Sequence, residues 1–184
     1  MLFSRQQCES WLRRGSVVAG VLATSVALAQ PAHAQKDMAS CKVVFDASAK
    51  MITTPSHLYM TMNLGNGKPI TSESISTGKV MYVLIDGKWT RSPLTVQDNL
   101  AREQANIKNA TAYSCHKLRS ESVSGVTATV YSAHEANEAG ASDSQIWIAN
   151  GTGLPLKIES HLAGGGTASS RIDYAHITAP AGVQ

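Results

Sequence analysis

The segment that decides the fold is Asp143-Ser-Gln-Ile-Trp-Ile-Ala-Asn-Gly-Thr-Gly-Leu-Pro-Leu-Lys-Ile-Glu159. It contains one apolar stretch, residues 145–149, and the beginning of a second, residues 154–163. Both have the length and the content of branched and aromatic side chains that are typical of strands. The residues Asn150-Gly-Thr-Gly153 between them favour a reversal of the chain. The segment therefore predicts two antiparallel strands joined by a turn.

Further strands flank this hairpin. Residues 113–123 and 126–133 precede it and residues 169–177 follow it, with glycine-containing connections between neighbours. Five consecutive strands with such connections predict an antiparallel meander. Glu135 and Glu138 flank a loop rich in alanine, asparagine and glycine, where we expect a solvated tip rather than an acid/base pair.

The first half of the chain adds shorter strands and two helices. Asp86-Gly87 is a strong signal for a two-residue hairpin turn. Ser92 followed by Pro93 is a candidate start for the second helix. The expected elements are a helix over 40–52, strands over 57–63, 69–76, 79–85 and 88–91, and a helix from 92 to about 109. The pattern predicts an α+β fold, a strongly curved antiparallel half-barrel of about eight or nine strands with two helices as a lid.

The N-terminus has the pattern of an export signal. Three arginines precede an apolar run from Gly15 to Ala29, and the run ends in Pro31-Ala-His-Ala34. Small residues two positions apart are typical of a signal-peptidase site. We expect residues 1–34 to be cleaved by the general secretory route, leaving residues 35–184 as a single exported domain.

Charge and composition narrow the class of function. The whole chain has a formal charge of +3, but residues 35–184 contain 13 Lys and Arg against 12 Asp and Glu. They show no basic run with interleaved aromatic residues, so nucleic acid is not expected as a partner. With 43% hydrophobic and 16% charged residues, the composition is that of a globular protein.

Two cysteines remain after the predicted cleavage, Cys41 and Cys115. An even pair in an oxidising compartment favours a disulfide. Because His116 follows Cys115 directly, half of a metal site or a reactive thiolate–imidazolium pair is the alternative.

The sequence contains no complete catalytic, metal or cofactor motif. No two of the five remaining histidines lie two to four positions apart, as a local metal site would need. No nucleophile elbow and no phosphate-binding loop occur either. We therefore predict no catalytic residue, no metal, no cofactor and no enzyme. The enzymatic alternative is a hydrolase assembled from the dispersed residues His57, His134 or His161.

The informative feature is a set of apolar side chains on several strands. Because two short helices cannot cover so wide a sheet face, the sheet either closes on itself or leaves an apolar hollow for a ligand, and we predict the hollow. Methionine suits such a hollow because its flexible side chain packs around varied apolar ligands. A filled core is the alternative. The candidate lining residues are Leu58, Met60, Met62, Met81, Val83, Ile85, Ile146, Trp147, Ile148, Leu156 and Ile158.

The hairpin quoted above resembles the late hairpin of the LolA/LolB-like superfamily, in which a Trp-containing strand leads through a turn to Gly-Leu-Pro-Leu-Lys. Trp147 and Gly153-Leu-Pro-Leu-Lys157 match that motif. The order of the elements over residues 41–178 is also similar. The resemblance implies a half-open curved sheet with a helical lid over an apolar cavity. No arginine occurs between Leu58 and Asn63, so the cavity arginine of the family's soluble carrier has no counterpart there.

By this resemblance we expect a periplasmic binding or carrier protein for a lipid, a lipoprotein acyl chain or a similar hydrophobic ligand. Its expected partners are that ligand and, in addition, a membrane-associated protein. The alternative is a periplasmic protein-interaction or envelope-sensor module that holds no ligand and uses an exposed edge strand.

Overall fold

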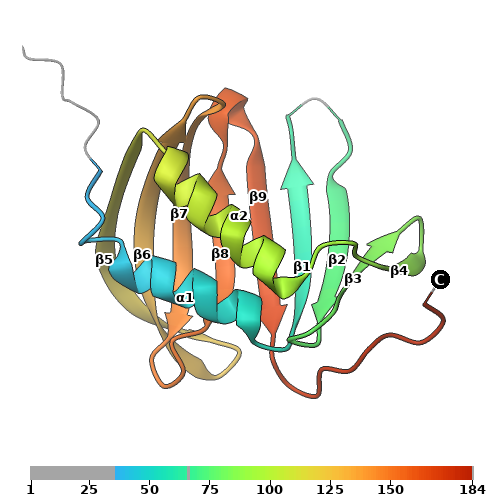
Figure 1. Ribbon diagram of the computed structural model, residues 1–184. Helices are drawn as coiled ribbons and strands as arrows, with labels where there is room; N and C mark the ends of the chain where they lie inside the picture. The colour runs from blue at the N-terminus through green and yellow to red at the C-terminus, as the bar shows by residue number, and fades with distance from the viewer. Residues whose placement is uncertain (1–35, 66, 184) are drawn as a thin grey trace, which may run out of the picture. The chain divides into compact units, whose positions relative to one another are not determined.

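The computed structural model describes residues 36–65 and 67–183 (Figure 1). The predicted signal peptide, residues 1–34, lies outside the described residues. The described elements are α1 (Lys42–Thr53), β1 (Ser56–Asn63), β2 (Ile70–Ser76), β3 (Met81–Ile85), β4 (Lys88–Arg91), α2 (Val96–Asn109), β5 (Ala112–Val123), β6 (Val126–Asn137), β7 (Gly140–Ala149), β8 (Pro155–His161), a 3-10 turn η1 (Ala163–Gly165) and β9 (Thr167–Asp173).

The nine strands form one antiparallel sheet in the order β4-β3-β2-β1-β9-β8-β7-β6-β5. The predicted meander forms β5 to β9, and the early hairpins form β1 to β4. These two parts join where β1 pairs with β9, for example Leu58 with Ile172. The sheet is open, with β4 and β5 at its edges. This confirms the predicted α+β class and the curved antiparallel sheet with two helices.

Two tight turns show why the hairpins close as predicted. Asp86 and Gly87 have positive φ angles of 49° and 75°, and Ser124 and Gly125 have φ angles of 50° and 83°. Positive φ at both central residues is the mark of the turn that matches the twist of two antiparallel strands. The two-residue turns therefore set the registers of β3 with β4 and of β5 with β6.

Both helices lie across the same face of the sheet (Figure 1). We call this the inner face; it carries Leu58, Ile146 and Ile158. Because side chains alternate along a strand, their sequence neighbours point to the opposite, outer face. Cross-strand pairs extend the assignment: Leu58 of β1 pairs with Ser74 of β2 and with Ile172 of β9.

The disulfide fixes α1 to the edge of the sheet. Cys41 precedes the first turn of α1, and its sulfur is bonded to that of Cys115 on β5 at 2.07 Å. Cys41 and Cys115 are buried and pack with Ala110 and Tyr113. The predicted Cys41–Cys115 disulfide is confirmed.

Helix α2 begins later than predicted. Thr95, not Ser92, is its N-cap: the Thr95 hydroxyl accepts from the backbone N–H of Asp98 at 3.1 Å. The Asp98 carboxylate in turn accepts from the backbone N–H of Thr95 at 2.8 Å. This reciprocal capping box satisfies two backbone donors at once, whereas Ser92 only accepts from Leu94 in the preceding turn.

The strands β6 and β7 are longer than predicted, and the expected loop between them is a tight turn. Their pairing continues to Asn137 opposite Gly140. A Cβ atom at Gly140 would lie 2.5 Å from the Cβ of Ala163, so only glycine fits there. Glu135 is therefore a half-buried strand residue rather than part of a solvated loop. At the other end of the meander, β9 stops at Asp173 instead of residue 177.

We predict that Cys115→Ser lowers the stability of the oxidised protein by about 4 kcal/mol, because the bridge closes a loop of 74 positions in the unfolded chain. Thermal and urea unfolding should be recorded with and without reductant. Reductant should lower the melting temperature of the wild type toward that of the variant and leave the variant unchanged. Equal stability of variant and wild type without reductant would contradict the prediction.

Candidate functional site

A hollow of about 160 Å³ lies between the helices and the inner face of β5 to β8. Ala47 and Met51 of α1 line one side, and Ile146 and Ile158 of the sheet line the other. The remaining lining residues are Val44, Phe45, Ser48, Glu103, Tyr113, Ala133, Glu135, Ser142, Ser144 and Pro155. We call this space hollow A.

A second hollow of about 300 Å³, hollow B, lies between α2 and the inner face of β1 to β3 and β9. Leu58 and Met81 are among its apolar lining residues. Met51 and Glu103 line both hollows, so the two spaces adjoin beneath α2. Together they extend along the inner face from β5 to β3.

The hollows exist because α2 does not pack down onto the sheet. None of its residues is buried, and its apolar residues Val96, Leu100 and Ile107 are only partly covered. A helix of a globular protein normally buries its apolar stripe against the core. Here that stripe instead faces space lined by sheet side chains.

Polar groups interrupt the apolar lining of hollow A. The Ser48 hydroxyl of α1 donates to the Glu103 carboxylate of α2 at 2.7 Å. Tyr113 of β5 lies opposite Glu135 of β6. Burial, and next the nearby charge of Glu135, raise the pKa of the Tyr113 hydroxyl well above its usual value, so it stays protonated. The lining of hollow A thus includes two carboxylates and a phenol.

Nine of the eleven predicted lining residues belong to the inner face. Leu58 and Met81 line hollow B, while Ile146 and Ile158 line hollow A. The other five are placed there by cross-strand pairing, strand alternation or packing: Met60, Met62, Val83, Ile85 and Ile148. Ile85 is 54% exposed at the far end of β3. Ligand contact by this set stays a prediction.

The structure places the other two predicted residues, Trp147 and Leu156, in a cluster on the outer face. Trp147 is 3% exposed and packs against Ala128, Val130 and Leu156. A register shift after Trp147 brings Leu156 to its side of the sheet. Leu156 also lines a separate open hollow of about 440 Å³ near the β5–β6 turn. Neither residue is among those that line hollows A and B.

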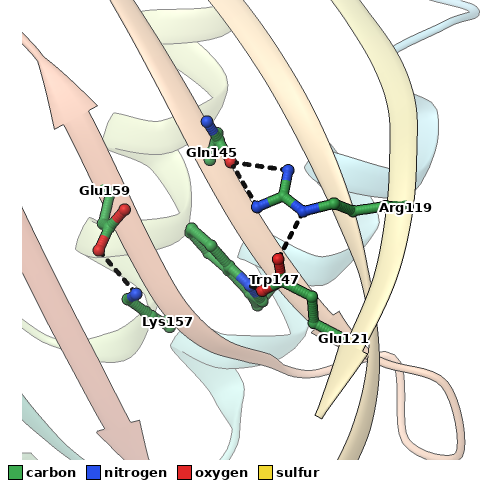
Figure 2. A network of polar contacts seen from close by, with 6 residues as sticks. All are labelled: Arg119, Glu121, Gln145, Trp147, Lys157 and Glu159. Carbon is green, nitrogen blue, oxygen red and sulfur yellow. Dashed lines mark hydrogen bonds and ion pairs between the residues drawn. The ribbon is translucent and has the colours of Figure 1, made fainter. Parts of the chain in front are cut away.

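A polar network covers Trp147 on the outer face (Figure 2). Its indole N–H donates to the Glu121 carboxylate at 2.5 Å, and Lys157 lies over the ring at 4.4 Å. Arg119 forms an ion pair with Glu121. Both of its terminal nitrogens donate hydrogen bonds to the side-chain oxygen of Gln145. Every charged group of this network has an opposite charge beside it, so the network carries no net charge.

Of the histidines of the hydrolase alternative, His134 and His161 both pair opposite Asp143, whereas His57 lies on a distant strand. His57 bonds Glu73 at 3.1 Å and Tyr59 at 2.9 Å, and His134 bonds Asp143 at 2.8 Å. His57 and His134 are four strands apart in the sheet order, and the row of His134 meets β1 at Asn63 rather than at His57. His161 pairs opposite Asp143, so all three belong to the outer face. Over the described residues, no group of three His, Cys, Asp or Glu side chains is arranged to hold a metal.

The residues that the sequence did not single out for the site come mainly from the helices and from β5 and β6. Val44, Phe45 and Met51 lie on the apolar stripe of α1, which the helical spacing could have identified. Glu135 alternates with Tyr131 and Ala133 on β6, but the predicted strand ended at residue 133. Neither α1 nor α2 is long and apolar enough to cross a membrane, and the described part of the chain contains no other α-helix.

No protein-family model and no curated protein matches the sequence. Solved structures to which the chain is similar include the lipoprotein LppX from Mycobacterium tuberculosis, with 11% identity and a TM-score of 0.46 over 79% of this chain and 100% of that one. A chain of the MucA/MucB complex from Pseudomonas aeruginosa has 16% identity and a TM-score of 0.46 over 77% of this chain and 59% of that one.

The solved structures also include a LolA superfamily protein from Nitrosomonas europaea, with 8% identity and a TM-score of 0.30 over 73% of this chain and 91% of that one. That protein is described as a member of the superfamily that the late hairpin of this sequence resembles. Because these TM-scores are below 0.5, inferences about function rest on the hollows themselves.

The buried Trp147 makes Glu121 a pH-dependent contributor to stability. The hydrogen bond from the Trp147 indole, and next that from Arg119, lower the pKa of Glu121 below its ordinary 4.5. A carboxyl group with a lowered pKa in the folded state stabilises the fold above its ordinary pKa, and this contribution is lost as the pH falls through the folded value.

We therefore predict that Glu121→Gln is less stable than the wild type at pH 7, and that the difference shrinks as the pH falls below 4.5. Urea unfolding at pH 7, 5 and 3 measures the free energy of unfolding of both proteins and thus their difference at each pH. Glu159→Gln is the matched control, because Glu159 pairs with Lys157 at 2.6 Å without reaching the indole. A difference that is independent of pH would contradict the assignment.

Proposed function

We propose that the protein is a non-enzymatic binding or carrier protein for a lipid, a lipoprotein acyl chain or a similar hydrophobic ligand, held between the helices and the inner face of the sheet. The observation that carries this proposal is α2, which crosses the sheet without a buried residue and spans two adjoining hollows. A ligand under α2 would supply the packing that the helix lacks.

Packing energetics support a ligand. Protein interiors are close-packed, and apolar side chains that border empty space lack dispersion contacts on that side. A hydrocarbon chain in hollows A and B would restore those contacts, and each buried methylene contributes about 0.8 kcal/mol before the ordering cost of the ligand. Hollow B, at about 300 Å³, already reaches the lower end of the size of ligand pockets.

We place this function in the periplasm. The proposal rests on the leader pattern in residues 1–34, with its arginines, apolar run and small residues before Gln35. The Cys41–Cys115 disulfide is in keeping with an oxidising compartment.

A second candidate function is a protein-interaction or sensor module. One observation favours it: Lys36 forms an isolated parallel bridge with Tyr113 on the edge strand β5. The backbone N–H of Asp37 donates to the Tyr113 carbonyl at 2.8 Å. The β5 edge can therefore accept an added strand, which is one way in which proteins bind extended peptides.

The first test is the mass of the protein isolated from the periplasm after expression of the full chain. We expect a denatured mass that corresponds to residues 35–184 with one disulfide, and a native mass that exceeds it by a molecule extractable with organic solvent. Protein that is ligand-free as isolated, and still ligand-free after incubation with lipids and lipopeptides, would favour the interaction module.

The second test fills hollow A. Ala133 on β6 lines the hollow, whereas Ala136 on the same strand belongs to the outer face. We predict that Ala133→Phe lowers ligand occupancy and affinity for a fluorescent fatty-acyl probe at least about tenfold, because the ring takes the space of buried methylenes. Ala136→Phe should bind like the wild type.

Melting temperatures distinguish this result from misfolding. A folded Ala133→Phe protein that binds the probe as tightly as the wild type would count against hollow A as the ligand site. If Ala133→Phe does not fold, Ser142→Phe provides the same test from the neighbouring strand β7, at the more open end of the lining.

A further inference from the structure

Two carboxylates face hollow A from opposite sides. Glu103 reaches it from α2 and Glu135 from β6, and both residues are half-buried. Glu103 accepts a hydrogen bond from the Ser48 hydroxyl at 2.7 Å. Glu135 accepts one from the side-chain amide of Asn137 at 3.3 Å. Both hydrogen bonds come from neutral donors, which leave the negative charges in place.

Neither carboxylate belongs to an ion pair among the described residues, and the charged neighbour of Glu103, Arg102, lines hollow B rather than hollow A. The lining of hollow A contains no lysine, arginine or histidine. The ion pairs of the described chain involve Asp46, Glu73, Glu121, Asp143, Glu159 and Asp173, but neither Glu103 nor Glu135. Hollow A therefore combines an apolar lining with a net negative charge.

This combination has a direct consequence for binding. Removing a carboxylate from water is costly unless a cation or several donors compensate for it. A ligand chain that fills hollow A excludes water from the space beside Glu103 and Glu135. An anionic head group would raise that cost through repulsion, whereas a cationic head group would offset it.

The protonated Tyr113 hydroxyl fits the same chemistry. Burial and the charges of Glu135 and Glu103 all hold its proton, so Tyr113 does not add a third negative charge. A primary ammonium has three N–H donors and no acceptor. The lining of hollow A offers more than enough acceptors for these three donors: two carboxylates, the Tyr113 oxygen and the Ser142 hydroxyl.

We infer that the ligand of hollow A is an amphiphile with a protonated primary amine, whose hydrocarbon chain packs against Ala47, Ile146 and Ile158 and whose ammonium group lies between Glu103 and Glu135. The inference rests on the proposed function and specifies its ligand class. It distinguishes alkylammonium ligands from fatty-acid anions of the same length.

The experiment compares three probes with the same twelve-carbon chain: dodecylamine, dodecanol and dodecanoate. Each is titrated into delipidated protein by calorimetry at pH 7.5, below the concentration at which it forms micelles. We expect the dissociation constant of dodecylamine to be at least about tenfold lower than that of dodecanoate, with dodecanol between them. Dodecyltrimethylammonium, which has the charge but no N–H donor, should bind less tightly than dodecylamine.

The variants Glu103→Gln and Glu135→Gln, alone and combined, test the residues. The double variant should bind dodecylamine less tightly and dodecanoate more tightly, which brings the ratio of the two constants close to one. Glu138→Gln is the matched control, because Glu138 is exposed in the β6–β7 turn and does not line hollow A. If the double variant fails to fold, Glu103→Gln alone suffices, because α2 contains no buried residue whose packing it could disturb.

The outcomes separate this inference from the proposed function. If the three probes bind with equal affinity, or dodecanoate binds best, the ammonium preference is wrong and the hydrophobic site stands. If the double variant keeps the wild-type preference for the amine, the assignment to Glu103 and Glu135 is wrong. If none of the probes binds to hollow A, the proposed function fails together with the inference.

Discussion

The pairing of β1 with β9 is the contact on which the rest of the structure depends. It joins Leu58 to Ile172 and Tyr59 to Arg171, partners more than a hundred residues apart in the chain. Without this pairing the four early strands and the five-stranded meander would be separate small sheets, each narrow enough for one helix to cover. With it, nine strands share one inner face that two helices of 12 and 14 residues cover only in part.

The two helices are held to that face in different ways, and the hollows follow from the difference. Helix α1 is tied to β5 by the Cys41–Cys115 bond and buries Ala47 against Ile146 and Ile148. Helix α2 has a well-formed N-cap at Thr95 and a hydrogen bond from Ser48 of α1, but no buried residue. An anchored helix beside a loosely packed one suits the lid of the proposed binding site, because only the weak contacts of α2 need to break before a ligand enters.

The two faces of the sheet also differ in how their carboxylates are paired. On the outer face, Glu121, Glu159 and Asp173 each lie beside a lysine or arginine, and the pairs of Glu121 and Glu159 belong to the network around the buried Trp147. On the inner face, Glu103 and Glu135 lie beside neutral donors only. Neutralised pairs are what a structural surface needs, whereas an unneutralised half-buried carboxylate is a cost that a binding partner can remove. This contrast supports the proposal that the ligand binds to the inner face.

The sequence by itself determined the local structure, because local structure depends on neighbouring residues. Asp86-Gly87 and Ser124-Gly125 specify tight turns, and the apolar spacing identifies both helices and the meander. The count of cysteines in an exported chain indicates the disulfide. The alternation of Leu58, Met60 and Met62 indicates which residues share a face, as does that of Ile146 and Ile148. The apolar character of the site was therefore predictable, and so were four of its sheet residues, Leu58, Met81, Ile146 and Ile158.

Only the tertiary structure decided which face the helices cover, because alternation defines two faces without distinguishing them. Trp147 was predicted to line the same site as Ile146 and Ile158, yet the register shift and the cluster with Val130 place it on the outer face. Glu135 was assigned to a loop because no local signal extends β6 past Ala133; the pairing with β7 does so. The meeting of Glu103 and Glu135 in one hollow depends on how α2 crosses the sheet, and that is set by contacts between residues far apart in the chain.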